Sequence, residues 1–246
     1  MKVAILYICT GKYKFFFKDF YESCEKYFLK DIAEVRYFVF TDDEKLTDAE
    51  NVKIIKKECK GFPMDSLLRF DMFLSLENEL KDFDYTFFFN ANMEFASPIG
   101  KEILPEKEGL AAVMHPGFFS KPSFMYPYER NKKSTAYIKP RDKEYTYFMG
   151  SLNGGRTKDY MALAKTCSEN THNDLDHGII ALVHDESHPN KYLHDKPCLK
   201  LSFEPKIIIR DKTKISQYFN KGRDHSVIGR LKKASRILYR AIIWNF

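Results

Sequence analysis

The stretch VAILYICTG, residues 3–11, is a run of apolar residues that ends in a Thr-Gly pair. Such a run predicts a buried β-strand followed directly by a turn. Aromatic and other apolar residues then recur at spacings of three and four across residues 13–28, which predicts one buried face of a helix. Apolar runs at 35–41 and 52–55 predict two more strands. This strand–helix–strand order is typical of a parallel sheet.

The same alternation continues to residue 114. Residues 64–80 are apolar nearly all round, which predicts a buried helix, and residues 85–89 and 110–114 predict buried strands. We therefore expect an α/β fold of one domain, a Rossmann-like and mostly parallel sheet flanked by helices on both faces. The second half is less regular, and its expected elements are a loop at 115–130, a strand near 147–152, and helices near 157–167 and 174–183.

Composition excludes several classes of protein. The 246 residues are 44% hydrophobic and 15% aromatic, which excludes a disordered or low-complexity chain. No run approaches the 18 apolar residues of a membrane span, and the N-terminal apolar run lacks the features of a signal peptide. The five cysteines are scattered and form no C-x-x-C pair, a pattern typical of reduced thiols in a cytoplasmic protein. The net charge of +6 is too small to indicate a nucleic-acid partner.

The segment FFFNANMEF, residues 87–95, places two amides at the end of a predicted strand. In an extended chain Asn90 and Asn92 point the same way, so both can face one ligand. Ligands of open α/β sheets bind at the carboxyl ends of strands, which is where this pair lies. The alternative is an Asx turn that closes the strand.

The segment HDESHPNKY, residues 184–192, gathers two carboxylates and two imidazoles in five positions. His184 and His188 have the spacing of a zinc-binding helix, but Asp185 stands where that motif needs Glu, and Pro189 follows the second His. We favour a carboxylate aimed at a reacting carbon or a sugar hydroxyl. The alternative is a solvated polar loop.

Two further features can serve either structure or function. Arg69 and Asp71 lie on the otherwise apolar helix at 64–80, so they form a structural ion pair or contact a ligand. The run FMGSLNGG, residues 148–155, is rich in small residues. Small residues let the backbone approach a ligand closely, or they form a tight turn.

Taken in order, these segments resemble glycosyltransferase family 6, which includes the mammalian histo-blood-group A and B transferases, the α1,3-galactosyltransferase and smaller soluble bacterial relatives. The resemblance covers residues 1 to about 205. The blocks that carry it are EKYF (25–28), YFVFTD (37–42), SLLRFDM (66–72), NANMEF (90–95), YER (128–130), AYI (136–138), the small residues before Gly154-Gly155, and HDESHPNKY (184–192).

The resemblance implies a GT-A fold and transfer of a sugar from a UDP-sugar donor to a β-galactoside, with an α1,3 link and retention at the anomeric carbon. The acceptor is then an oligosaccharide or a glycolipid. Glu186 falls at the glutamate proposed as nucleophile or oxocarbenium stabiliser, beside the acceptor, and His115 matches a histidine that contacts the acceptor. The positions implied to bind the donor are Ile8, Cys9, Thr10 and Tyr13 (uracil and ribose), Arg69, Asn90, Asn92, Met149, Gly150, Ser151, His184 and Asp185.

The donor sugar depends on two positions in this resemblance, Met149 and Ser151. The small Ser151 leaves room for an acetamido group, which favours UDP-GalNAc, whereas Met149 matches the galactose-using form. We expect an α1,3-N-acetylgalactosaminyltransferase, with a UDP-Gal-using α1,3-galactosyltransferase as the alternative. An α1,2-linked fucose on the acceptor is implied only by the blood-group enzymes. The alternative from another class is an inactive protein that binds a sugar nucleotide or a glycan.

The chain departs from the mammalian members at one motif, since Asn90-Ala91-Asn92 stands where they carry Asp-x-Asp. Divalent cations such as Mn²⁺ and Mg²⁺ need carboxylate oxygens and their charge, and two neutral amides are weak ligands. Amides can still hydrogen-bond phosphate or sugar hydroxyls. We therefore expect an enzyme that requires no divalent metal and no other cofactor.

The charge excess lies in one segment. Between residues 221 and 240 there are seven basic residues and one acid, which accounts for the whole +6. We therefore divide the chain into a catalytic domain at 1–220 and a basic amphipathic tail at 221–246. By resemblance Lys221 and Arg223 fold over the donor diphosphate. Residues 226–246 also resemble a helix that lies on an anionic membrane at its inner face, or they form a solvated helix packed on the domain.

Overall fold

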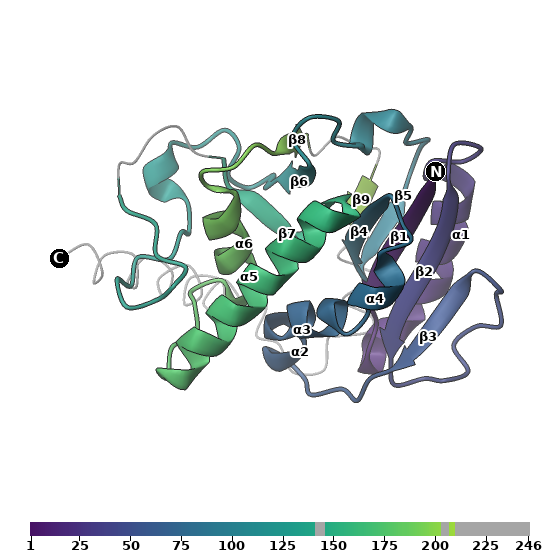
Figure 1. The fold of residues 1–246 in the computed structure, drawn as a ribbon, viewed down its shortest axis with the longest axis horizontal. Coiled ribbons are helices and arrows are strands. Elements are labelled where there is room, and N and C mark those ends of the chain that lie inside the picture. The colour runs from purple at the N-terminus through teal and green to yellow at the C-terminus, as the bar shows by residue number, and fades with distance from the viewer. Residues whose placement is uncertain (141–145, 203–206, 210–246) are drawn as a thin grey trace, which may run out of the picture.

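The computed structural model describes residues 1–140, 146–202 and, for the backbone alone, 207–209. These residues form one α/β unit in which helices cover both faces of a central sheet (Figure 1). The strands are β1 (Lys2–Ile8), β2 (Glu34–Thr41), β3 (Val52–Lys56), β4 (Tyr85–Asn90), β5 (Met93–Phe95), β6 (Leu110–Met114), β7 (Phe148–Arg156), β8 (Leu199–Leu201) and β9 (Ile207–Ile209). The helices are α1 (Phe17–Tyr27), α2 (Met64–Leu67), α3 (Arg69–Leu74), α4 (Glu77–Leu80), α5 (Thr157–Asp176) and α6 (His184–Leu193), with 3₁₀ turns η1 (Gly11–Phe16), η2 (Lys101–Ile103) and η3 (Ser123–Met125).

The main sheet has seven strands in the order β3-β2-β1-β4-β7-β6-β8. Strands β1 to β4 are parallel, β6 and β8 are parallel, and β7 runs antiparallel to both of its neighbours. The expectation of a mostly parallel sheet, consistent with a GT-A-like fold, is confirmed. The chain moves outward from β1 to β3 and then returns to place β4 on the other side of β1. Strand order reverses there, and a ligand crevice is expected at that switch point.

Alternate residues of each strand feed two separate hydrophobic cores. Ile5 and Tyr7 of β1 pack against the aromatic face of α1. In this core the rings of Tyr7 and Phe20 stack with their centroids 4.3 Å apart. Ala4 and Leu6 point to the opposite core, which is covered by α3, α4 and α5. Burial on both faces explains why the strand reads as a continuous apolar run instead of an alternating one.

The expectation of a single helix at 64–80 is wrong, because the backbone leaves helical geometry at Leu68 and Leu76. The Ser75 hydroxyl donates to the carbonyl of Met72 at 2.6 Å, which competes with the regular helical ladder. The three short helices that result are α2, α3 and α4. The first break makes Arg69 the first residue of α3.

The expectations for residues 174–192 are also corrected. Helix α5 runs on to Asp176, the predicted helix at 174–183 is absent from the described residues, and α6 begins at His184. The polar-loop interpretation of HDESHPNKY is therefore wrong, because these residues form α6 almost completely, and α6 packs against β7. Within the described ranges, no helix combines the length and the apolar character that a bilayer span requires. The proposed boundary at 220/221, Lys221, Arg223 and the segment 226–246 lie outside the described residues.

Candidate active site

A cavity of about 270 Å³ opens at the carboxyl ends of β1 and β4, where the strand order reverses. The register pairs Ile8 with Asn90, so the two strand ends lie level with each other. Of the residues expected to bind a donor, the cavity is lined by Ile8, Thr10, Tyr13, Arg69, Asn90 and Asp185.

One wall of the cavity is organised by Asp65 of α2. Its carboxylate accepts hydrogen bonds from the backbone N–H groups of Lys60 at 3.1 Å and Gly61 at 2.9 Å, and from the Thr10 hydroxyl at 3.3 Å. Gly11 has φ +58°, and its N–H donates to Asp42 at 3.0 Å. The Asp65 bonds tie the loop after β1 to α2 and to the loop before it, and the Gly11 bond ties the loop after β1 to the residue that follows β2.

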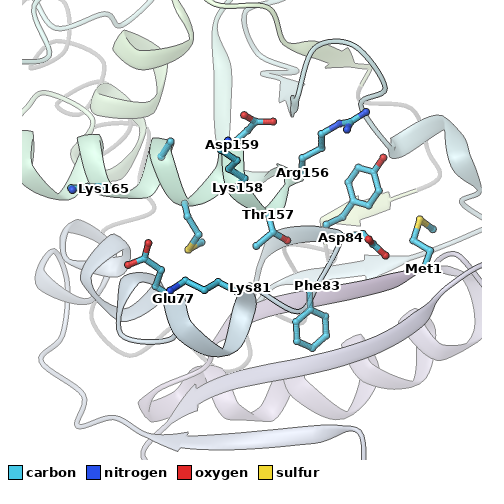
Figure 2. A pocket seen from close by; sticks show the side chains of 13 residues that line it. Met1, Glu77, Lys81, Phe83, Asp84, Arg156, Thr157, Lys158, Asp159 and Lys165 are labelled. Atoms are coloured by element: carbon cyan, nitrogen blue, oxygen red, sulfur yellow. The ribbon is translucent and has the colours of Figure 1, made fainter.

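A larger groove, of about 1020 Å³, lies at the opposite end of the sheet, beside the amino ends of β1 and β4 (Figure 2). It lies between α4 and the start of α5, and its charged residues carry both signs, as with Lys158 beside Asp159. None of the residues singled out from the sequence lines it. The smaller cavity, at the strand ends where ligands are expected, is therefore the candidate active site.

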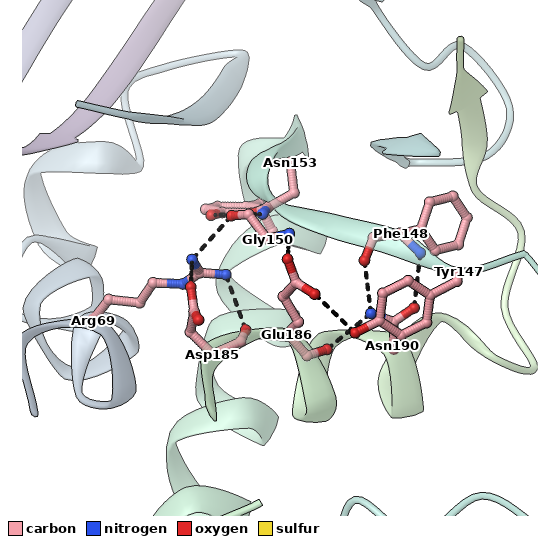
Figure 3. A network of polar contacts seen from close by, with 9 residues as sticks. Arg69, Tyr147, Phe148, Gly150, Asn153, Asp185, Glu186 and Asn190 are labelled. Atoms are coloured by element: carbon pink, nitrogen blue, oxygen red, sulfur yellow. Dashed lines mark hydrogen bonds and ion pairs between the residues drawn. The ribbon is translucent and has the colours of Figure 1, made fainter. Parts of the chain in front are cut away.

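Arg69 is the charged centre of the site (Figure 3). Its side chain is 1% exposed and its guanidinium lies over the rings of Phe70 and Phe88, 5.0 and 4.8 Å from their centroids. It donates to the Asp185 carboxylate, to the Asp185 carbonyl at 3.1 Å and to the Gly150 carbonyl at 2.9 Å. A buried guanidinium requires such partners.

The pairing of Arg69 with Asp71 that the sequence left open does not form. The Asp71 carboxylate instead accepts a hydrogen bond from Ser168 and lies 3.0 Å from the His172 ring, both on α5. Asp71 therefore joins α3 to α5, while Arg69 joins α3 to α6 and β7.

Pro189 explains why the Asp185 carbonyl is available to Arg69. In an α-helix the N–H of residue 189 donates to the carbonyl of residue 185, and proline has no N–H. Arg69 Nη2 takes the place of that missing donor, 3.1 Å from the oxygen. The proline inside α6 thus creates part of the arginine site.

Glu186 is held at both carboxylate oxygens (Figure 3). Oε1 accepts from the Gly150 backbone N–H and Oε2 from the Tyr147 hydroxyl, each at 2.8 Å. Burial raises the pKa of Glu186, and the Asp185 carboxylate raises it further. The two hydrogen bonds and Arg69 act in the opposite direction on that pKa. Both oxygens of this half-buried carboxylate are therefore oriented, and its perturbed pKa marks it as a candidate functional group.

Gly150 makes this close approach possible. A Cβ at position 150 would lie 2.8 Å from Glu186 Cγ and 3.1 Å from Asp185 Oδ2. Farther along β7, a Cβ on Gly154 would lie 2.3 Å from the Phe87 ring. The small residues of 148–155 therefore serve close packing inside a strand, and the tight-turn interpretation is wrong.

Asn190 and Tyr147 are site residues that the sequence analysis did not single out. The Asn190 side chain bonds both the N–H and the carbonyl of Phe148, at 2.9 and 2.8 Å, and the Glu186 carbonyl at 2.9 Å. These bonds fix α6 against β7. A helical interpretation of HDESHPNKY would have found Asn190, because residues four apart share one helix face.

The remaining expected residues lie at different depths around this centre. His115 is half-buried, with its ring centroid 5.7 Å from that of Tyr147, and burial lowers its pKa. His184 has φ +27°, and its ring packs 4.8 Å from Phe62, which lines the cavity. Met149 and Ser151 are both buried in β7.

Cys9 does not present its side chain to the cavity. The thiol lies in the core under α1, and burial raises its pKa to about 12. Its carbonyl accepts a hydrogen bond from Thr41. Any contact of Cys9 with a ligand is therefore limited to its backbone.

The amide pair does not act as the sequence predicted. Strand β4 ends at Asn90, and the next two residues form a turn, so Asn90 and Asn92 do not lie on one extended face. Asn90 lines the cavity, whereas Asn92 Oδ1 is buried with no partner among the described residues. No group of three or more His, Cys, Asp or Glu in the described part of the chain could hold a metal ion. The residues at this position do not fit a divalent cation.

Comparison with known proteins shows similarity to glycosyltransferases. The family model described as "Glycosyltransferase family 6" matches residues 1–221. The O-antigen biosynthesis glycosyltransferase WbnI of Escherichia coli is 38% identical over 234 residues, which cover 89% of this chain and 99% of that protein.

Two vertebrate glycosyltransferases are also similar to this chain. The histo-blood group ABO system transferase 1 of Rattus norvegicus is 34% identical over 82% of this chain, and the globoside alpha-1,3-N-acetylgalactosaminyltransferase 1 of Gallus gallus is 29% identical over 83%. The matches span 60% and 61% of the length of these two relatives.

Proposed function

The chain belongs to glycosyltransferase family 6, and from this premise we propose that it is a retaining α1,3-glycosyltransferase that moves N-acetylgalactosamine from UDP-GalNAc to the galactose of a β-galactoside. Family membership makes the chain a hexosyltransferase with a sugar-nucleotide donor and a glycan acceptor. One observation carries the proposed mechanism. It is the half-buried Glu186 carboxylate, held by Gly150 and Tyr147 next to the Arg69–Asp185 pair.

The proposed reaction breaks the bond between the anomeric carbon and the diphosphate oxygen and forms a bond to the acceptor hydroxyl oxygen. The hydroxyl proton passes to the departing diphosphate. Retention requires a group on the face of the sugar opposite the leaving diphosphate, either to attack the anomeric carbon or to stabilise its positive charge. We assign this role to Glu186, because its carboxylate is fixed in direction beside the cavity wall formed by Arg69 and Asp185.

We propose that transfer needs no divalent metal. The amides Asn90 and Asn92 replace the carboxylates that a hard cation prefers, and only Asn90 faces the cavity. Arg69 lines the cavity from its inner side, and the exposed Lys12 lies at its rim. Fixed cationic side chains can stabilise a departing diphosphate.

The donor preference rests on Ser151. Its side chain is buried in β7 one residue from Gly150, and its hydroxyl has no partner among the described residues. A small side chain there favours the acetamido group of GalNAc. The chicken relative is named as an N-acetylgalactosaminyltransferase, which supports the same choice.

The assay offers UDP-GalNAc and UDP-Gal, each with an α1,2-fucosylated and a plain β-galactoside, in EDTA throughout. We expect transfer from UDP-GalNAc under chelation, with an α-linked product by NMR. Product from UDP-Gal alone would make the chain a galactosyltransferase. Activity that appears only with added Mn²⁺ would refute metal independence. Binding without turnover for every pair would identify a glycan- or nucleotide-binding protein.

The substitution Glu186→Gln tests the catalytic assignment. We expect the variant to bind UDP-sugar with unchanged affinity and to lose transfer by on the order of 10³-fold, because an amide neither attacks nor stabilises positive charge well. Calorimetric titration with UDP-GalNAc in the absence of acceptor and a UDP-release assay measure the two quantities. The exposed Glu58→Gln is the matched control. Near-normal turnover of Glu186→Gln would remove Glu186 from the mechanism.

A further inference from the structure

Tyr147 stands directly before β7, and its hydroxyl reaches the carboxylate of Glu186 on α6. The side chain is 2% exposed, and the oxygen lies 2.8 Å from Glu186 Oε2. An ionised carboxylate only accepts hydrogen bonds, so the phenol is the donor. Within the described residues this is the one side-chain hydrogen bond to that carboxylate, since Oε1 is held by a backbone N–H.

We propose that Tyr147 is a positioning residue for sugar transfer: its hydroxyl fixes the plane of the Glu186 carboxylate and couples it to the side of the site where the acceptor lies. This inference rests on the proposed function. It adds a residue that acts through Glu186 and does not touch the anomeric carbon.

Packing fixes the tyrosine ring. Its centroid lies 5.3 Å from that of Phe118, 5.4 Å from Tyr128 and 6.1 Å from Tyr126. These edge and tilted contacts pack the 2%-exposed ring on several sides, which restrains the direction of its hydroxyl. The Tyr147 hydroxyl therefore donates to Glu186 Oε2 from a fixed direction.

The same ring touches the acceptor side of the site. His115, which the resemblance places against the acceptor, packs 5.7 Å from the Tyr147 ring. Tyr147 thus lies between His115 and Glu186, in contact with both.

Charge around the carboxylate supports the assignment. The groups that face Glu186 are Asp185 on its own helix, Arg69 of α3 and Tyr147. Burial and the Glu186 charge raise the pKa of Tyr147 well above its ordinary value, so the phenol stays protonated. Its hydrogen bond lowers the pKa of Glu186 against the effect of burial. Removal of the hydroxyl should therefore raise the pKa of Glu186.

Tyr147→Phe tests the proposal, because it removes the hydroxyl and keeps the ring. Tyr128→Phe is the matched control, since that hydroxyl belongs to the same cluster and donates to the backbone carbonyl of Thr146 at 3.0 Å. We expect Tyr147→Phe to lower kcat roughly 10- to 100-fold, the effect of one lost hydrogen bond to a charge. The donor KM should stay within about 2-fold. The acid limb of the kcat profile should move to higher pH, and Tyr128→Phe should show neither change.

A second measurement does not need turnover. The loss of unfolding free energy in Tyr147→Phe should grow as pH rises and Glu186 ionises, whereas the loss in Tyr128→Phe should stay constant. Equal kinetic effects of the two variants, or a pH-independent loss of stability in both, would overturn the proposal. If the wild type transfers no sugar, the proposed function fails, and the stability measurement still decides whether Tyr147 governs Glu186.

Discussion

Replacement of Gly150 by alanine adds one methyl group at the narrowest point of the site. That methyl group would lie 2.8 Å from Glu186 Cγ, 3.1 Å from Asp185 Oδ2 and 3.5 Å from Arg69 Nη1. Gly150 is not among the glycines with positive φ, so its backbone accepts alanine without strain. The perturbation is therefore one of side-chain contact, and its closest contacts are with Glu186 and Asp185.

The size of the effect follows from these distances. Carbon atoms pack best at about 3.5–4.0 Å, so Glu186 must retreat by roughly 0.7–1.2 Å. A misplacement of about 1 Å at a reacting group can cost on the order of 10²-fold in rate. Overpacking of this kind costs about 1–3 kcal/mol of unfolding free energy. We expect Gly150→Ala to fold, to bind UDP and to lose about 10²-fold in kcat.

Steady-state UDP release and urea unfolding measure these two quantities. Gly100→Ala is the control, because the one atom its Cβ would approach too closely is the end of the Glu102 carboxylate at 2.8 Å, and that flexible side chain can move aside. A Gly150→Ala enzyme with more than half of the wild-type kcat would refute the reasoning. It would mean that the catalytic position of the Glu186 carboxylate does not depend on its contact with residue 150.

Two further predictions concern charge in the site. Asp185→Ala should lower the unfolding free energy by about 3–5 kcal/mol, because it strands a guanidinium that is 1% exposed, whereas Arg69→Met should cost less, because the Asp185 side chain is 25% exposed and water can solvate it. Urea unfolding measures both, and the reverse order would contradict the assigned burial. The raised pKa of Glu186 means that the unfolded chain releases its proton first as pH rises, so ionisation of this group destabilises the fold. Glu186→Gln should therefore have a higher Tm than the wild type at pH 7, and the difference in Tm should shrink toward pH 4. A wild type with the higher Tm at pH 7 would show that burial does not dominate the pKa of Glu186.

Local patterns in the sequence sufficed for most of the sheet. The strand expected at 110–114 has those bounds in the structure, and those at 35–41 and 52–55 differ by one residue at an end. Buried parallel strands are continuous apolar runs, so local hydrophobicity reveals them. The same signal failed at 64–80, where apolar residues all round fit a single helix as well as three short ones.

The sequence also singled out Arg69 and the polar cluster that contains Asp185 and Glu186, because charged groups on an apolar helix and clustered acids are chemically unusual, and the role of Glu186 was implied only by the family resemblance. It left the partner of Arg69 undecided, since Asp71 is two residues away and Asp185 is 116 residues away. Asp71 is the nearer acid along the chain, but its carboxylate contacts Ser168 and His172 of α5 instead of Arg69.

What the sequence determined by itself is the α/β class, the long apolar strands and several of the charged site residues, because these depend on periodicity and residue type. What only the tertiary structure decided is which groups meet. Arg69 reaches Asp185 because α6 packs against β7 through Asn190, and Pro189 leaves a carbonyl free for the guanidinium. Tyr147 reaches Glu186 for the same reason. Contacts between residues so far apart in sequence depend on how strands and helices are stacked, and no local pattern encodes that.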